Sequence, residues 1–488
     1  NRRNLPPIGD TSRTQTCPLL NPLAVAYAGL DEELAGMLRT AIDEQGGNTD
    51  GLLPAWLFVN TTSPTRPIAR RSVLYPDYAA FLHGGAPGAE SYLAYRQTKT
   101  TFQHFHSDQG SFTWFAKGVP LMLDFGSMYS PRTAQAIYHN RIAWDVREGE
   151  PRPCPGSGQG GCFYQGMTWF EHTHEPWTAK AESFTDRMAV ADAQGTVIAH
   201  AFLPGADFLC GQSDVRALET EAYFKDSAVG QADDPTQQRK VEPVAPFSWQ
   251  RRLLFVKAPV EFLLVRDDFL GHCPPPTASF WMLASALRVE GNHARAAGLF
   301  GVDLDLYVAQ PAQARIGQWY YEHKNWGGER QVCARVTQPE GKPFLTLLYP
   351  RRTGEPAPAF ATMAGGNGVK ITRPDATAYA FLAPAPVTAA EGGITIRGTA
   401  GMLQVAGGDV CAVLSAGGTL ALADMTIVTD GPAEARRTGA RWTLQTAGAQ
   451  TVQIQQGARR RAMLLNGRPV TAGQLKLDQR NHTLTFDE

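Results

Sequence analysis

Short apolar runs separated by turn residues recur along most of the chain from about residue 72 onward. Segments such as SYLAYRQ, SFTWFAKG, VPLMLDFG and FLTLLYP are rich in β-branched and aromatic residues. This pattern of short apolar runs is typical of antiparallel β structure. Between Arg252 and Phe269, two apolar runs are separated by Lys-Ala-Pro, which predicts a β-hairpin. Residues 146–180 and 205–245 lack the pattern, so we expect long loops there.

A different period marks the start of the chain, where residues 22–45 have helical spacing. Leu30, Leu34, Leu38 and Ile42 recur four apart, and helical character ends near the Gly-Gly pair at 46–47. One or two helices cannot bury a core by themselves. This segment must therefore dock on the following region or on helices outside this chain.

After about Pro386 the side chains become smaller and the composition less varied. Gly, Ala, Thr and Val dominate, and short strand-like runs with turn signals continue to the end. We interpret this part as a smaller C-terminal β-domain or a second sheet layer. The chain as a whole is expected to be mainly β, with a short N-terminal helical segment.

Length, charge and hydropathy narrow the classes of function. With 488 residues the chain is too long for one compact core, so two or three domains are expected. The formal net charge of −1 shows no basic excess for nucleic acid, so an anionic substrate would need a local basic site. There is no apolar run of about 18 residues, so no transmembrane helix is expected. The first residues, NRRNLPPIGD, lack a signal peptide's apolar segment, so we expect any export signal to be already removed.

The seven cysteines are scattered and form no Cys-x-x-Cys pair of the kind found in zinc ribbons. Cys154 and Cys162 flank the glycine-rich loop PGSGQGG. A disulfide between them would favour an oxidising compartment. The alternative is that all seven are buried, apolar cysteines.

The densest group of polar residues lies within 102–145. His104, His106 and Asp108 alternate in FQHFHSDQGSF, so in a strand they project to the same face. The turn Lys-Gly-Val-Pro at 117–120 predicts a hairpin that brings His106 close to Asp124. With His139 from a third strand, these residues could hold zinc in a tetrahedral array.

Spacing alone does not establish this metal site. A His-x-His pair on a strand is more often part of a polar sheet face than a metal site. Asp124, just before Phe-Gly at 125–126, could equally cap a turn.

The same stretch resembles the signature of the heparinase II/III-like polysaccharide lyases. In that family HxHxDxxSF is followed by a G-x-P turn, a D-x-G and a later His-Asn pair. The matching residues are His104, His106, Asp108, Ser111, Phe112, Gly118, Pro120, Asp124, Gly126, His139 and Asn140. Weaker similarity extends to LPPIGD at 5–10 and to RRLLFVKAPVEFLLVRDDF at 251–269.

The resemblance implies an architecture. Members of that family combine an N-terminal helical (α/α) toroid with a large antiparallel β-sandwich and a further β-region. It identifies residues 1–65 as the end of a toroid, 66–385 as the β-sandwich and 386–488 as the C-terminal β-domain. The main departure is that most of the toroid is missing, so no upstream Tyr or Asn-His pair can be assigned.

The resemblance also implies roles for the matching residues. His106, Asp124 and His139 correspond to the family's zinc ligands, and the zinc there is mainly structural. His104 corresponds to a histidine that faces the cleft and helps neutralise the carboxylate of the uronate. Asp108 is then expected to orient a histidine.

The implied activity is β-elimination in a polysaccharide that contains uronic acid. The reaction needs a neutralised carboxylate, a base for the α-proton and an acid for the leaving oxygen. In the family, the tyrosine and an asparagine or second histidine come from the toroid. We therefore expect the rest of the cleft to come from a longer enzyme or from a second polypeptide, with lost activity as the alternative.

Further side chains are candidates for contact with a sugar. Tyr138 could line the cleft, Arg141 could grip a carboxylate, and Trp169 belongs to one of two tryptophan-rich loops, 164–177 and 319–326. A buried tyrosine, an exposed salt bridge and tryptophans that plug the ends of the sandwich are the respective alternatives. A second His-x-His pair, His172 and His174, could bind metal or line a subsite.

Two other functions compete with the lyase. One is a non-catalytic, zinc-stabilised module that binds carbohydrate or serves a structural role. The other is a metal-dependent hydrolase or cupin-like oxygenase, for which the spaced glutamate of a cupin is missing. The expected partners are an acidic polysaccharide and a chain supplying the toroid, with homo-oligomerisation left open and neither nucleic acid nor membrane. The expected location is periplasmic or extracellular.

Overall fold

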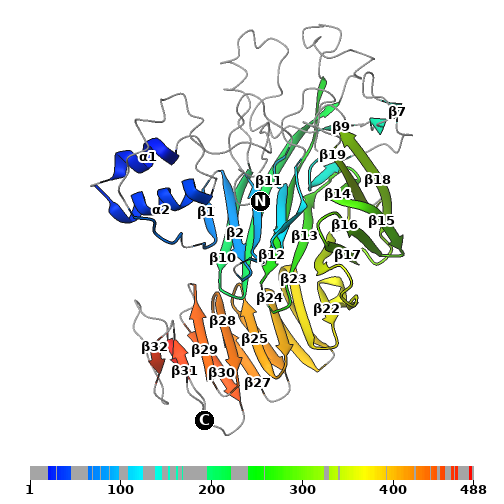
Figure 1. Cartoon of the computed structure of the whole chain (residues 1–488). Coiled ribbons are helices and arrows are strands. Elements are labelled where there is room, and N and C mark those ends of the chain that lie inside the picture. The colour runs from blue at the N-terminus through cyan, green and yellow to red at the C-terminus, as the bar shows by residue number, and fades with distance from the viewer. Residues whose placement is uncertain are drawn as a thin grey trace.

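The computed structural model shows a mainly β protein with two short helices at one side (Figure 1). The structure describes residues 20–28, 30–44, 64–68, 70–76, 78–86, 88–97, 108–124, 138–144, 152–153, 161–162, 167–168, 195–220, 240–257, 259–323, 329–338, 341–391, 393–422, 425–439, 441–447, 451–456, 463–465, 468–470 and 483–485. Within these residues, no helix is long and apolar enough to cross a lipid bilayer.

The helical period at the N-terminus is divided between two helices, α1 (Leu20–Tyr27) and α2 (Glu32–Glu44). Asp31 precedes α2, and its Oδ1 accepts the backbone N–H of Leu34 at 2.9 Å, which caps the helix. Leu30 falls between the helices and is 83% exposed, so it leaves the apolar face that the spacing predicted.

Helix α2 docks on the segment that follows it. The N–H of Arg66 donates to the carbonyl oxygen of Gly36 at 3.0 Å, and Thr40 Oγ1 donates to the carbonyl oxygen of Arg66 at 2.6 Å. A Cβ atom at Gly36 would lie 2.4 Å from Arg66 Cγ, so glycine permits this close approach. Of the two expected docking partners, α2 therefore contacts the segment that follows it; docking on helices outside this chain stays a prediction.

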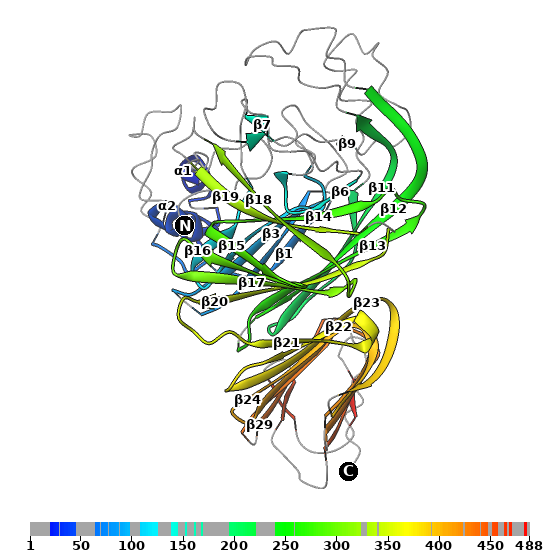
Figure 2. The same cartoon turned by 90° about the vertical axis from the view of Figure 1, so that its right-hand side faces the viewer.

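Three antiparallel sheets build the larger, upper part of the molecule (Figure 2). The N-terminal sheet has the order β1 (Val73–Tyr75), β2 (Ala79–Gly84), β3 (Ser91–Arg96), β4 (Phe112–Ala116), β5 (Val119–Met122). The central sheet has the order β10 (Gly195–Phe202), β11 (Ala206–Thr220), β12 (Lys240–Val256), β13 (Phe262–Gly271), β20 (Phe344–Arg352), β17 (Val302–Gln310), β16 (His293–Gly298), β15 (Ala284–Glu290), with β9 (Met167–Thr168) beside β11. The short sheet has the order β18 (Arg315–His323), β19 (Glu329–Thr337), β14 (Pro276–Met282), β6 (Ile142–Trp144). A separate pair joins β7 (Arg152–Pro153) to β8 (Gly161–Cys162).

The predicted hairpin at 252–269 is confirmed as β12 and β13, which pair from Val256 opposite Phe262 outward. Its apolar runs are continuous because both faces are buried. Leu253 and Val265 pack in the core shared with the N-terminal and short sheets, whereas Leu254 and Leu264 pack in the core shared with the C-terminal sheet. This hairpin is therefore the middle layer of the fold.

The prediction of a long loop over 205–245 is wrong at both ends, because β11 covers Ala206–Thr220 and β12 already begins at Lys240. Residues 221–239 lie outside the described residues, as does most of the loop predicted over 146–180. The cause of the error is a row of polar residues on one face of β11 and β12. Gln250 Nε2 donates to Gln212 Oε1 at 2.8 Å, and Ser248 Oγ donates to Asp214 Oδ1 at 2.5 Å. Cross-strand polar pairs stabilise a sheet without the alternation that the sequence pattern requires.

The C-terminal sheet lies below the central sheet in Figure 1. Its members are β21 (Ala359–Met363), β22 (Gly368–Thr372), β23 (Ala376–Glu391), β24 (Ile394–Ala406), β25 (Asp409–Leu414), β26 (Gly418–Leu422), β27 (Met425–Thr429), β28 (Ala433–Thr438), β29 (Arg441–Thr446), β30 (Thr451–Gln456), β31 (Met463–Leu465), β32 (Arg468–Val470) and β33 (Thr483–Thr485), and a 3₁₀ turn covers Ala364–Gly366. The two halves of β24 pair with different strands, β26 and β25, around a further apolar core. The predicted domain boundary at 385/386 falls inside β23, and the boundaries stay predictions.

Four cysteines of the described residues, Cys210, Cys273, Cys333 and Cys411, have free thiols. Burial raises the thiol pKa of Cys210 and of Cys333 to about 11 in each case. These thiols are poor nucleophiles as a result. The predicted Cys154–Cys162 disulfide lies outside the residues whose side chains are described.

His83, on β2, makes the fold sensitive to acid. Burial, followed by the positive charges of Arg70 and Lys257, lowers the pKa of this imidazole from 6.5 to about 4. The folded state then binds fewer protons than the unfolded state between these values, so stability falls as the pH drops through this window. We expect His83→Gln to remove this acid-dependent loss of stability, which amounts to at most about 3 kcal/mol. The measurement is the free energy of urea unfolding of each protein at neutral pH and near pH 4.

Comparing the unaltered protein with His83→Gln separates the effect of His83 on stability from that of the nearby Asp207. Burial raises the pKa of Asp207 to about 6, which acts in the opposite direction because the folded state then holds the extra proton. That contribution is common to wild type and variant. Parallel pH profiles for the two proteins would contradict the role given to His83, and His200→Gln, at an exposed position on β10, is the control.

Candidate functional site

A tight hairpin, β4–β5, forms one side of the candidate site. The predicted turn at 117–120 is confirmed, and its two central residues, Lys117 and Gly118, have φ angles of 53° and 85°. Positive φ at both positions is what a two-residue turn between twisted antiparallel strands requires. The hairpin places Asp124 just beyond the end of β5, at a position that is 4% exposed.

Asp124 and His139 meet in the interior. His139 Nδ1 lies 2.9 Å from Asp124 Oδ2, and the two side chains are 0% and 4% exposed. This contact with the carboxylate fixes the orientation of the imidazole ring. Two of the three predicted zinc ligands are therefore brought together, while the third, His106, lies outside the described residues.

The donor atoms of this pair suit zinc. An imidazole nitrogen and a carboxylate oxygen are both ordinary zinc ligands, and two ligands of a tetrahedral zinc site lie roughly 3.3 Å apart. The observed 2.9 Å separation fits two neighbouring ligands as well as a direct hydrogen bond. Within the described part of the chain, no group of three His, Cys, Asp or Glu residues is placed to hold a metal.

Asn140 holds this corner of the molecule together. Its Nδ2 donates to the carbonyl oxygen of Phe112 on β4 at 2.9 Å, and its Oδ1 accepts the N–H of Trp281 on β14 at 2.6 Å. Its own N–H donates to Ser111 Oγ at 3.2 Å. Because Asn140 follows His139 directly, these bonds fix the imidazole between the N-terminal sheet and the short sheet.

A buried ion pair lies beneath Asn140. Arg251 on β12 donates from Nε and Nη2 to the two carboxylate oxygens of Asp267 at 2.7 and 2.9 Å. Its Nη1 donates to the carbonyl oxygens of Gly110 and Asn140 at 2.8 and 2.6 Å. Trp249 Nε1 also donates to Asp267 at 2.8 Å. These bonds fix the backbone of Gly110 and Asn140 against the central sheet.

Sequence reasoning missed the role of Arg251 and Asp267, although a signal was present. In the predicted hairpin, charged residues stand at the outer ends of both apolar runs, at 251–252 and 266–268. Antiparallel pairing places Arg251 opposite Asp267. Buried charges are paired in proteins, so the register alone would have predicted this ion pair.

Gly110 makes room for this arrangement. It has a φ of 70°, and a Cβ atom added there would lie 2.4 Å from Trp249 Cη2. We expect Gly110→Ala to lower the free energy of unfolding by about 2–5 kcal/mol, because left-handed strain and overpacking add. Gly88, with a φ of 86° and open space around it, is the matched control. In chemical denaturation, an equal loss for both variants would show that Trp249 exerts no steric effect.

The other residues predicted for the site have different surroundings. Asp108 is buried, and its Oδ2 accepts a hydrogen bond from Arg96 Nη1 at 2.5 Å. The histidine that it was expected to orient would be His104 or His106, both outside the described residues. His104 itself, the predicted catalytic residue, therefore keeps its role only as a prediction.

The predicted substrate-binding residues that are described lie in the interior. Tyr138 is 3% exposed and stacks on Trp281, with ring centroids 6.0 Å apart. Arg141 is 0% exposed, donates from Nε to the carbonyl oxygen of Ile142 at 2.9 Å and lies over the ring of Trp249. Contact of either side chain with carbohydrate stays a prediction. Trp169 lies outside the described residues, as do His172 and His174.

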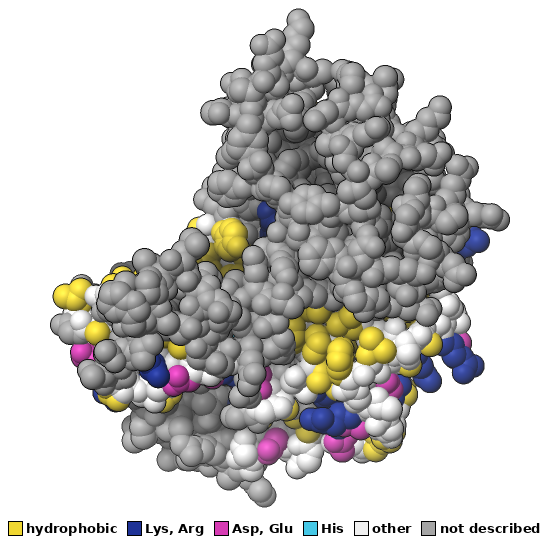
Figure 3. Space-filling view, turned by 45° about the horizontal axis from the view of Figure 1, so that its top comes forward, with side chains coloured by type: hydrophobic (Ala, Val, Ile, Leu, Met, Phe, Trp, Pro, Cys, Tyr) yellow, Lys and Arg dark blue, Asp and Glu magenta, His cyan; other side chains and the backbone are white. Residues whose placement is uncertain are grey.

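Figure 3 shows one face of the molecule, on whose described part basic and acidic side chains lie among hydrophobic ones.

Comparison with known proteins gives matches among solved structures alone, because no protein-family model and no curated protein matches this sequence. The heparan sulfate lyase HepC from Pedobacter heparinus is 12% identical, with a TM-score of 0.47 over 76% of this chain and 49% of that chain. Heparinase III is 10% identical, with a TM-score of 0.46 over 83% of this chain and 50% of that chain. This chain thus spans about half the length of the structures it matches.

Proposed function

We propose that this chain is the β-sandwich part of a polysaccharide lyase that cleaves an acidic, uronic-acid-containing polysaccharide by β-elimination. The observation that carries the proposal is the buried contact between Asp124 and His139, 2.9 Å apart. These residues are 15 positions apart and belong to the sequence signature that resembles the heparinase II/III-like lyases. Their convergence is what that signature requires of a folded site.

In the proposed reaction His104 contacts the uronate and helps neutralise its carboxylate. Neutralisation makes the α-proton acidic enough for a base to remove, and an acid then protonates the leaving oxygen. Both proton-transfer groups are proposed to come from a helical toroid, carried by a longer form of the enzyme or by a second chain. Helices α1 and α2 are proposed to be its end.

His106, Asp124 and His139 would hold the zinc ion. When bound, zinc would supply structural cross-linking of strands and a fixed positive charge near the cleft wall. The carboxylate of Asp124 and the ring of His139 are held by the surrounding core whether or not they bind metal. An enzyme of this kind acts on polysaccharide outside the cytoplasm, so we propose a periplasmic or extracellular location.

The proposal is tested by incubating this chain together with the helical toroid, in the longer form of the enzyme or with the second chain, with alginate, heparan sulfate, hyaluronan and ulvan. Each β-elimination creates an unsaturated uronate whose ultraviolet absorbance is followed continuously. Rising absorbance with one of these substrates supports the lyase. If the protein with its toroid is folded and zinc-loaded, binds an acidic polysaccharide and yields no unsaturated product, the result would instead favour a non-catalytic carbohydrate-binding module.

A further inference from the structure

Residues 108–111, within the signature, form a β-turn that is held by the end of β3. The N–H of Ser111 donates to the carbonyl oxygen of Asp108 at 2.9 Å, and Gly110, the third residue of the turn, has a φ of 70°. The N–H of Arg96 donates to the carbonyl oxygen of Ser111 at 2.9 Å, and the N–H of Gly110 donates to that of Arg96 at 2.8 Å. Arg96, the last residue of β3, therefore holds the turn through its backbone.

The side chain of Arg96 holds the same turn a second time. Its Nη1 donates to Asp108 Oδ2 at 2.5 Å, and the two side chains are 13% and 2% exposed. The other carboxylate oxygen, Asp108 Oδ1, is buried and has no hydrogen-bond partner among the described residues. Leaving a buried carboxylate oxygen without a donor costs free energy. Asp108 is therefore placed to receive one further N–H group.

His106 is the nearest candidate for that donor along the sequence. It stands two positions before Asp108 and lies outside the described residues. In the extended strand that the sequence predicts, residues two apart share a face and lie roughly 7 Å apart, whereas residues four apart lie roughly 13 Å apart. We therefore expect the carboxylate of Asp108 to reach the ring of His106 and not that of His104.

Two contacts connect the turn to the segment that carries His139. Ser111 Oγ accepts the N–H of Asn140 at 3.2 Å. Arg251 Nη1 donates to the carbonyl oxygens of both Gly110 and Asn140, at 2.8 and 2.6 Å. Asn140 follows His139 directly, so a shift of the turn would move the backbone beside this imidazole.

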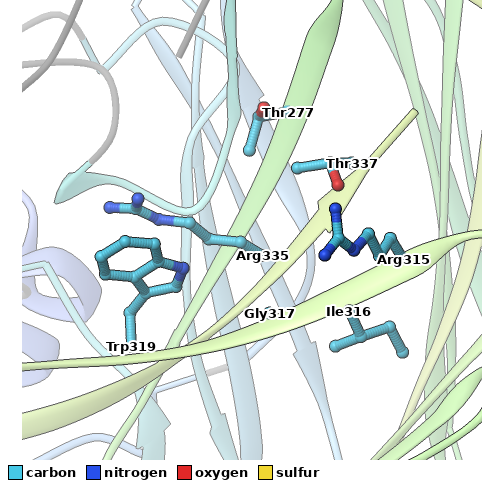
Figure 4. A pocket seen from close by; sticks show the side chains of 7 residues that line it. All are labelled: Thr277, Arg315, Ile316, Gly317, Trp319, Arg335 and Thr337. Atoms are coloured by element: carbon cyan, nitrogen blue, oxygen red, sulfur yellow. The ribbon is translucent and has the colours of Figure 1, made fainter. Parts of the chain in front are cut away.

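The short sheet holds the opposite side of the same segment. Its strand β14 bonds to Asn140 through Trp281 and is paired on both sides, with β6 and β19. On one face of this sheet, where a pocket of about 180 Å³ opens, Arg335 packs over Trp319 with its guanidinium carbon 4.2 Å from the ring centroid (Figure 4). That side is fixed by sheet pairing and packing, so Arg96 acts on the side of the turn.

We propose that Arg96 is a positioning residue of the candidate zinc site. Through Asp108 it sets the place of the turn, and thereby the positions of His106 and His139 as ligands. The inference deepens the function proposed above and rests on its zinc site. Arg96 itself would contact neither the metal nor the polysaccharide.

Zinc binding by the whole chain tests this role, because it is measured without substrate and without the toroid. Metal is removed by chelation, and the zinc Kd is then measured by competition with a chromogenic chelator. The variants are Arg96→Met, Asp108→Asn, the double variant, and Arg96→Lys, which keeps the charge but loses the planar guanidinium. Arg351→Met is the matched control, since Arg351 pairs with Asp303 and Asp305 on the central sheet and its side chain is 14% exposed.

We expect Arg96→Met and Asp108→Asn each to raise the zinc Kd by about tenfold or more, the usual effect of losing a residue that orients a metal ligand. Because Arg96 acts through Asp108, the double variant should raise the Kd no more than the worse single variant does. Arg96→Lys should recover part of the affinity. Arg351→Met should change the Kd by less than about twofold, since distant sites act independently.

A purely structural role would give a different result. It would lower the thermal midpoint of the zinc-free Arg96 and Arg351 variants alike and leave the zinc Kd of both unchanged. That result, additive effects in the double variant, or an unaltered chain that binds no zinc would overturn the positioning role. If Arg96→Met does not fold, the same outcomes are judged on Asp108→Asn. Zinc binding that depends on Arg96, without product formation when the toroid is present, would contradict the lyase function and leave the positioning role standing.

Discussion

Replacing Arg251 by methionine is expected to lower the free energy of unfolding by about 3–5 kcal/mol, which is the usual cost of removing one partner of a buried ion pair. The substitution leaves Asp267, which is 1% exposed, without its guanidinium. It also removes the donors for the carbonyl oxygens of Gly110 and Asn140. Chemical denaturation followed by tryptophan fluorescence measures the loss.

Two further variants make this prediction specific. Arg288→Met removes an ion pair with Glu290 in which the arginine side chain is 79% exposed, and such pairs contribute at most about 1 kcal/mol. The double variant Arg251→Met with Asp267→Leu replaces both charges by apolar groups and should recover part of the lost stability. If Arg251→Met costs no more than Arg288→Met, the network does not support the site in the way that its geometry indicates.

The general fold could be predicted from the sequence where burial is one-sided or complete. The run from 252 to 269 predicts a hairpin because two apolar runs, whose residues face two cores, are separated by Lys-Ala-Pro. The strands at Ala206–Thr220 and from Lys240 onward could not be predicted this way. Their polar residues bond to each other across strands, so the side chains carry no hydrophobic alternation to detect.

The candidate site was predictable in its residue types and less so in its architecture. Asp124 and His139 were singled out from a local signature, and a hairpin was expected to bring Asp124 close to His106. What positions His139, however, is the side chain of Asn140, which bonds to Trp281, 141 residues further along the chain. Contacts of that range depend on how whole sheets pack, and no local pattern encodes them.

Replacing His104 by alanine is expected to reduce the rate of unsaturated product formation by about a hundredfold or more, the usual range for losing a group that assists proton removal. The zinc content and the thermal midpoint should stay close to those of the unaltered protein, because His104 is proposed to face the substrate. The rate is followed by ultraviolet absorbance with the toroid present, on the polysaccharide that the unaltered assembly cleaves. Zinc is measured by elemental analysis after gel filtration.

Replacing His139 by alanine is expected to give the complementary result. Its ring is fully buried against Asp124, so the variant should lose most of its zinc and should unfold at a lower temperature. Asp124→Asn is the conservative companion, since it keeps the shape of the side chain while removing the charge that a metal would need. Adding excess zinc to the unaltered protein after chelation should restore both the metal and the thermal midpoint. If instead His104→Ala loses the metal while His139→Ala keeps it, the roles of these histidines are reversed, and the buried pair is a hydrogen bond of the core alone.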